Sequence, residues 1–291
     1  MNWITNLYHN FLSRSIVERI ILINVALFVL TYLFNTFSFL LQIDGNFIVN
    51  WFTLQPDFGL LLERPWTIIS YGFLHLGFFH ILFNMLVLYY FGNLFMDFFN
   101  SKQFLLYLIL GIISGGFIYM LSYNYMPGLK TQNSLLVGAS AGVMAIVIGV
   151  SSYIPYYSIN FRFIGNIKLL YIAVALVVLD VVQIPTGNAG GHLAHLGGSL
   201  IGFLLTTYLD QGKGLISWIS GAITKKEKKP LKTVYKNTKS TKSTKNSTYT
   251  KKETKSEEQA RIDSILDKIS KSGYETLSKE EKDYLFKAGK K

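Results

Sequence analysis

The chain of 291 residues contains no cysteine. This absence excludes disulfide bonds, thiolate metal sites and a cysteine nucleophile. Charge is also scarce, because Asp, Glu, Lys and Arg make up only 15% of the residues, whereas a soluble globular domain carries about a quarter. Basic and acidic residues nearly balance up to Gly221, so nearly all of the net charge of +11 lies beyond it. The sequence therefore divides into an apolar body and a basic tail.

The apolar body contains six segments that we interpret as membrane-spanning helices. A span needs about 20 largely apolar residues. Several of the six are short or rich in glycine, which is typical of helices shielded by neighbouring helices. They run from about residue 20 to 41, 78 to 95, 104 to 121, 135 to 154, 169 to 184 and 189 to 209. We expect an all-α polytopic membrane protein built on a six-helix transmembrane bundle.

The lysines and arginines beside these segments predict the orientation. Arg14 and Arg19 precede the first segment and the basic tail follows the last, whereas the alternate set of loops holds only Arg64 and Lys130. Basic flanks stay on the cytoplasmic side. We therefore expect a multi-pass protein of the cell inner (cytoplasmic) membrane with both termini in the cytoplasm.

Outside the spans, the pattern predicts three further regions. Residues 1–18 have the apolar spacing of an interfacial helix, and residues 19–210 form the six-span domain. Residues 211–256 are a basic linker that we expect to be disordered and attracted to anionic lipid. Residues 257–291 have the spacing of a helical hairpin, with Ser278 and Glu281 as a capping box. No aromatic stacking pattern accompanies the basic residues, so we expect no nucleic-acid partner.

Strongly polar residues lie inside three of the apolar segments, and such residues are functional candidates. His80 and Asn84 lie at the start of the second segment, Ser140 near the start of the fourth and His195 near the start of the sixth. These three segments all run from outside to inside. Ser140 is about five residues into its segment, or about 8 Å at 1.5 Å per residue. The candidates are therefore expected in one layer below the outer surface.

The residue types in this layer fit acyl transfer. A serine hydroxyl needs a base, and histidine is the usual one. The oxyanion needs hydrogen-bond donors, which His80, Asn84 and the backbone N–H of Ser140 can supply. Gly198 and Gly202 follow His195 on its own helix face, and small residues at this spacing allow close helix contact. Ser140 and His195 are thus predicted as a catalytic pair between two helices.

At these residues the chain resembles the rhomboid intramembrane serine proteases. The matching motifs are His80-Ile81-Leu82-Phe83-Asn84, Gly138-Ala139-Ser140, and Ala194-His195-Leu196-Gly197-Gly198 with Gly202. The resemblance implies a Ser140–His195 dyad without an acid, and an oxyanion site that uses His80 and Asn84 beside Gly138. It also implies a water-filled cavity open to the outside, transmembrane proteins as substrates and no cofactor.

The chain departs from this family's pattern at three positions. Ala141 replaces the usual glycine after the nucleophile, and its methyl group is expected to narrow the oxyanion site. Met144 stands where a tyrosine often packs on the imidazole. Thr67 follows Trp66 where an arginine is typical, so a charge that anchors the first outer loop is missing. These departures bear on rate and substrate preference more than on the type of reaction.

Other interpretations of the polar residues remain open. His192 competes with His195 as the base, although the small residues favour His195. His75 is interpreted as structural or in contact with a loop. For Asp180, a capped or interfacial acid is favoured over a residue that contacts the site. A rhomboid-like protein that binds clients without cutting them is the second hypothesis, and a histidine-lined metal transporter is the third. No metal is expected, because no His-Glu-x-x-His occurs. The Gly-x-Ser-x-Gly match to hydrolases is accidental, since no strand precedes it.

Overall fold

The computed structural model describes residues 3–130, 134–162, 165–223 and 255–288. The chain divides into two compact units, Met1–Lys228 and Lys229–Lys291. The predicted disordered part of the basic linker falls largely on residues 224–254, which lie outside the described residues. Each unit is therefore described by itself.

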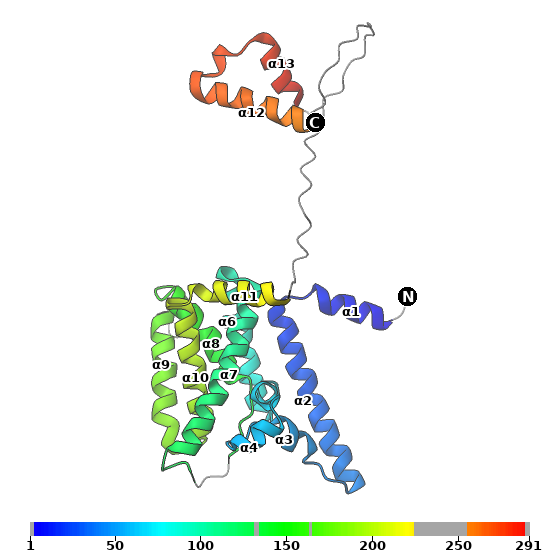
Figure 1. The fold of residues 1–291 in the computed structure, drawn as a ribbon, viewed down its shortest axis with the longest axis vertical. Coiled ribbons are helices and arrows are strands. Elements are labelled where there is room, and N and C mark those ends of the chain that lie inside the picture. The colour runs from blue at the N-terminus through cyan, green and yellow to red at the C-terminus, as the bar shows by residue number, and fades with distance from the viewer. Residues whose placement is uncertain (1–2, 131–133, 163–164, 224–254, 289–291) are drawn as a thin grey trace. The chain divides into compact units, whose positions relative to one another are not determined.

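The first unit is a bundle of long helices, which stand side by side in Figure 1 with α2 at one edge. Their bounds lie close to the predicted spans, and they are α2 (Ile16–Leu41), α6 (Phe78–Phe98), α7 (Ser101–Tyr125), α8 (Ser140–Tyr153), α9 (Leu169–Gln183) and α10 (Ala189–Thr207). Within the part of the chain that the structure describes, four helical segments are long and apolar enough to cross a membrane: α2, α6, α7 and Leu169–Thr186. α8 is a shorter apolar helix. The architecture is a polytopic helical bundle, as predicted, and the count of six spans stays a prediction.

α8 is the centre of the bundle. All of its residues from Ala141 to Ser151 are buried. Its 14 residues cover about 21 Å at 1.5 Å per residue, which is less than the hydrocarbon thickness of about 30 Å. A helix this short is tolerated because α6, α7, α9 and α10 surround it instead of lipid.

Glycine lets three of these helices approach to backbone contact. A Cβ atom at Gly198 would collide with the Ala141 carbonyl, and one at Gly202 with the Ala145 carbonyl, so α10 lies directly against α8. α7 meets α10 in the same way, because a Cβ at Gly197 would lie 2.9 Å from the Gly115 Cα. This close packing confirms the predicted helix contact at Gly198 and Gly202.

Polar side chains fasten the same three helices. The Ser114 hydroxyl of α7 donates to the Gly197 carbonyl of α10 at 2.9 Å. Further along, Thr206 of α10 donates to the Gly149 carbonyl of α8 at 3.1 Å and lies 3.0 Å from the Tyr107 hydroxyl of α7. Buried polar groups are costly unless they are paired. These bonds therefore fix the register in which the three helices meet.

The first long loop folds into short helices: α3 (Phe47–Phe52), α4 (Phe58–Glu63), α5 (Thr67–Ser70) and the 3-10 turn η1 (Tyr71–Phe73). Arg64 lies over the Trp51 ring at 4.4 Å, and Trp51 stacks on Trp66 with ring centroids 6.1 Å apart. The Trp66 Nε1 donates to the Trp51 carbonyl at 2.7 Å. The expectation that an anchoring charge is missing is therefore wrong, because Arg64 supplies it from another position.

Three features of the ends and connections differ from the sequence expectation. The predicted interfacial helix of residues 1–18 is α1 (Trp3–Ser13), and it ends there because Ser15 and Glu18 form a capping box that starts α2. A two-stranded antiparallel hairpin, β1 (Ser158–Phe161) and β2 (Gly165–Lys168), precedes α9. The 3-10 turns η2 (Ile184–Thr186) and η3 (Asp210–Gly212) flank α10, and α11 (Lys213–Ile223) is the last described helix of the unit. The expectation of disorder from residue 211 onward is therefore wrong over α11, because this stretch is largely apolar.

The second unit contains the predicted helical hairpin. α12 (Lys255–Ser272) and α13 (Lys279–Ala288) are joined through the 3-10 turn η4 (Tyr274–Thr276). Both halves of the Ser278–Glu281 capping box form, at 2.8 and 3.3 Å. Lys268 pairs with Glu281 at 3.0 Å, and Ile265 and Leu277 are buried. Leu266 of α12 is 48% exposed.

The α8–α10 contact predicts a steric effect that can be measured. In Gly202→Ala, the methyl group meets the Ala145 carbonyl, and such overpacking costs about 2 kcal/mol. We expect the midpoint of thermal unfolding in detergent to fall by roughly 5 °C. The control is Gly214→Ala in α11, where a Cβ meets nothing within 4 Å. Equal midpoints for the two variants would contradict the close contact.

Candidate active site

The polar residues singled out in the sequence line one cavity of about 720 Å³. Its walls come from α6, α8, α9, α10 and the segment that leads into α8. The polar and ionisable groups on this surface are His80, Asn84, Ser140, Asp180, Gln183, Asn188, His192 and His195. Apolar side chains make up the rest of the wall, among them Phe79, Phe83 and Met144. The expected gathering of these residues in one place is confirmed.

Ser140 is the first residue of α8, not a residue five positions inside a helix. The preceding segment is extended and pairs with the first loop through a bridge between Leu136 and Leu54. Gly138, at φ +116°, then turns the chain into the helix, a conformation that side chains with a Cβ rarely adopt. The first N–H groups of a helix have no partner within it. The backbone N–H of Ser140 is thus available as a donor beside its own hydroxyl.

Two hydrogen bonds hold the turn before Ser140. The Gly138 N–H donates to the Tyr71 carbonyl at 2.9 Å. The Ala139 N–H donates to Nε2 of His75 at 3.4 Å. The interpretation of His75 as a loop-contacting residue is therefore confirmed. Its ring also lies edge-on to that of His80, with centroids 5.1 Å apart.

His80 lies against the turn that carries the serine. A Cβ atom at Gly138 would be 2.7 Å from the His80 Nε2 and 3.7 Å from the Ser140 Oγ. Only glycine leaves room for the imidazole here. Gly138 therefore acts through its conformation and its missing side chain, and His80 can direct a donor at the space beside Ser140.

Asn84 lies one turn further along α6. Its Nδ2 donates to the His80 carbonyl at 2.9 Å, and the side chain lines the cavity. An amide nitrogen carries two hydrogens, so one remains for a group in the cavity. The bond to His80 fixes which way that amide points.

The extra methyl group of Ala141 does not face the cavity. Ala141 is buried, and its Cβ would lie 2.6 Å from a Cβ placed at Gly115 of α7. The expectation that this methyl narrows the oxyanion site is wrong, because it fills the helix interface instead. Met144, one turn further, does line the cavity.

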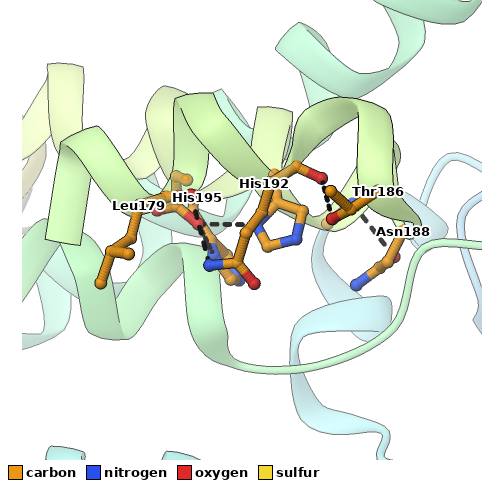
Figure 2. Close-up of polar contacts among 8 residues, drawn as sticks. Leu179, Thr186, Asn188, His192 and His195 are labelled. Carbon is orange, nitrogen blue, oxygen red and sulfur yellow. Dashed lines mark hydrogen bonds and ion pairs between the residues drawn. The ribbon is translucent and has the colours of Figure 1, made fainter.

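The two histidines of α10 share one carboxylate. The Nδ1 atoms of His192 and His195 each lie 2.8 Å from the same Oδ1 of Asp180. Figure 2 shows both imidazoles on α10 together with the dashed lines that mark polar contacts. Asp180 belongs to α9 and is 6% exposed. The favoured interpretation of Asp180 as a capped or interfacial acid is therefore wrong, and the alternative, contact with the site, is confirmed. The signal for it is a carboxylate in an otherwise uncharged span.

The packing of α10 distinguishes its two histidines. Gly198 touches the backbone of Ala141, the residue after Ser140. His195 is one helical turn before Gly198 and on the same face, so it lies at the level of Ser140. His192 lies one further turn toward the start of α10. There Asn188 caps the helix, because its Oδ1 accepts a hydrogen bond from the Gly191 N–H at 3.3 Å. This register favours His195 as the partner of Ser140.

Asp180, His192 and His195 also form a possible donor set for a divalent cation, because their ligand atoms lie within 4.8 Å of one another. Both imidazoles offer Nδ1 to the carboxylate at hydrogen-bond distance. Two N–H groups and one carboxylate oxygen satisfy one another without a metal. The expectation that no metal is used stays a prediction.

Comparisons with known proteins agree with these motifs. The family model of the rhomboid domain matches residues 62–211, and a family of unknown function, DUF6576, matches residues 249–291. RHOMBOID-like protein 12, mitochondrial, of Arabidopsis thaliana is 27% identical over 69% of this chain and 60% of its own length. RHOMBOID-like protein 4 of the same plant is 34% identical over 53% of this chain and 38% of its own length.

A human protein also matches part of this chain. Presenilin-associated rhomboid-like protein, mitochondrial, of Homo sapiens is 26% identical over 55% of this chain and 41% of its own length. This chain thus spans 60% or less of the length of the three relatives.

His75 predicts a pH effect on stability. Burial, and then the neighbouring His80, lowers its pKa from the ordinary value of 6.5 to about 4. Below pH 6.5 the unfolded chain takes up a proton that the folded chain does not, so stability falls as the pH falls toward 4. The slope is about 1.4 kcal/mol per pH unit.

The measurement is the midpoint of thermal unfolding between pH 7 and 4 for the unaltered chain and His75→Gln. The glutamine does not titrate, so we expect its midpoint to depend less on pH. His9→Gln, at an exposed histidine of α1, should follow the unaltered chain. If the midpoint depends on pH equally in all three proteins, the lowered pKa of His75 in the folded chain is contradicted.

Proposed function

The chain belongs to the rhomboid family, and we propose that it is an intramembrane serine endopeptidase. It hydrolyses peptide bonds in or next to transmembrane segments of other membrane proteins. The observation that supports this most is the cavity that brings together Ser140 of α8, His195 of α10, and His80 and Asn84 of α6. A multi-pass membrane protein with this cavity has access to substrates that lie in the bilayer.

Ser140 is the nucleophile. His195 takes the proton from the Ser140 hydroxyl as the oxygen attacks the carbonyl carbon of the peptide bond, and then gives it to the leaving amine nitrogen. Water attacks the resulting ester in the second half of the reaction, with His195 again as the base. The contact of Gly198 with Ala141 supports this assignment, because it sets the two helices in register.

The oxyanion is stabilised by His80, Asn84 and the backbone N–H of Ser140. Charge that develops on the carbonyl oxygen is stabilised by donors already in position. Ser140 lies at the start of α8, where the helix dipole also favours negative charge. The bond from Asn84 to the His80 carbonyl keeps the amide in place during turnover.

We also propose that the chain lies in the cell inner (cytoplasmic) membrane. The basic residues beside the spans indicate that both termini face the cytoplasm. In this orientation the start of α8 faces the outer side, and the basic tail meets anionic lipid. The mitochondrial relatives make an organelle membrane the alternative.

Loss of either reacting group should abolish cleavage. We expect purified protein in liposomes to cut at least one member of a panel of transmembrane substrates. Ser140→Ala should lose this activity with unchanged thermal unfolding, and His195→Ala should lose it as well. Ser151→Ala is the matched control, since Ser151 is a buried serine of the same helix whose hydroxyl has no partner among the described residues.

A fluorophosphonate should label the unaltered chain and Ser151→Ala but not Ser140→Ala. Cleavage that persists in Ser140→Ala would contradict the proposed nucleophile. Binding of substrates with neither cleavage nor labelling would favour the non-cutting client-binding protein.

The proposed role of Asn84 predicts a loss in rate. Asn84→Ala removes one oxyanion donor, and we expect kcat to fall about 100-fold while KM changes little. Asn93→Ala is the matched control, because Asn93 lies on the same helix and makes the same kind of bond, to the Tyr89 carbonyl at 2.7 Å. An equal effect of the two substitutions on kcat would argue that Asn84 acts only on the helix.

A further inference from the structure

α9 carries a single charged residue inside an apolar helix. Its sequence from Leu169 to Gln183 is uncharged except for Asp180. The helix buries little of itself, and its buried residues are Leu169, at its first position, and Asp180. A carboxylate within a span is costly unless it is paired. The helix therefore turns its one charge inward, toward the cavity.

The partners of this carboxylate are the two imidazoles of α10. Oδ1 of Asp180 lies 2.8 Å from Nδ1 of His195 and 2.8 Å from Nδ1 of His192. A carboxylate only accepts hydrogen bonds, so each Nδ1 must carry its hydrogen. Each ring then has its lone pair on Nε2. A base that accepts the serine proton through Nε2 needs this tautomer.

We propose that Asp180 is a positioning residue that completes a Ser140–His195–Asp180 arrangement, in which the carboxylate orients His195 and stabilises the imidazolium formed during attack. This inference rests on the proposed protease function and deepens it. The proton moves from the Ser140 oxygen to Nε2 of His195 and on to the leaving amine. Asp180 keeps its charge throughout and accepts the Nδ1–H bond, which strengthens when the ring becomes cationic.

His192 has a supporting part in this arrangement. Its Nδ1–H is a second donor to the same carboxylate oxygen. Two donors offset the cost of holding a carboxylate in a largely buried place better than one. His192 therefore helps to hold the carboxylate of Asp180 in line with His195. The assignment gives distinct roles to two histidines that the sequence left in competition.

The test compares three substitutions in liposomes against a substrate that the unaltered chain cleaves. Asp180→Asn keeps the shape but removes the charge, and we expect kcat to fall about 10- to 100-fold with KM within about threefold. The rate of fluorophosphonate labelling of Ser140 should fall by a similar factor. Asp180→Glu retains a carboxylate and should recover part of the loss. Asp97→Asn is the control, since Asp97 is an exposed carboxylate at the end of α6.

The outcomes separate this inference from the proposed function. If the unaltered chain shows no cleavage that depends on Ser140, the protease function fails and this inference fails with it. If cleavage depends on Ser140 but Asp180→Asn keeps its kcat and labelling rate, only this inference fails. It also fails if Asp180→Asn and Asp180→Glu lose activity only in proportion to a lower thermal midpoint, which marks a purely structural role. Loss of activity on adding a chelator to the unaltered chain would make Asp180 a metal ligand instead.

Discussion

The bundle depends on the backbone contact between α8 and α10. At Gly198 and Gly202 no side chain separates the two helices, and the carbonyls of Ala141 and Ala145 fill the space that a Cβ would need. This contact sets the register of the two helices from which Ser140 and His195 line one cavity. It also buries α8 so completely that a helix too short to span the bilayer by itself is stable in the middle of the bundle. Ser140 and His195 therefore belong to helices whose register is fixed by shape.

The same bundle must hold polar groups in apolar surroundings, and several of those around the cavity are paired. The turn before Ser140 is bonded to Tyr71 and His75, Asn84 is bonded to the His80 carbonyl, and the carboxylate of Asp180 has two imidazole donors. Each pairing also selects an orientation or a tautomer. The interactions that offset the cost of a polar cavity in an apolar bundle are thus also the ones that orient its side chains, as the proposed acyl transfer requires.

Much of the fold and of the site follows from the sequence, because both rest on local signals. Span positions depend on hydropathy, and the ends of α6, α9 and α10 lie within a few residues of those expected. The histidines, Asn84, Ser140 and the glycines of α10 were found because polar or very small residues stand out in apolar helices. Their meeting in one cavity also follows from the direction in which each span runs. The rest depends on long-range contacts.

The features that the sequence did not reveal depend on contacts between residues far apart in the chain. The inward direction of Asp180 depends on how α9 is rotated against α10. The apolar residues of this largely exposed helix show little periodicity, so the sequence does not indicate which face turns inward. The sequence suggests that the Ala141 methyl faces the cavity. Which side of α8 packs against α7 depends on the folded bundle, and there the methyl lies against Gly115 of α7. Arg64 replaced the missing loop charge from three residues before Thr67, which only the folded loop shows. Ser140 at the very start of α8 follows from the left-handed Gly138, whose conformation is not encoded by the span pattern.

The central claim is that a hydroxyl from α8 and an imidazole from α10 act together beside the donors of α6. An experimental structure of the chain in a lipid nanodisc after reaction with a fluorophosphonate tests it most directly. We expect the phosphorus atom to be bonded to Oγ of Ser140, its free oxygen to point at His80 and Asn84, and the His195 imidazole to lie within hydrogen-bond reach of the serine oxygen. An adduct on another residue, or a His195 ring turned away from a modified Ser140, would contradict the claim.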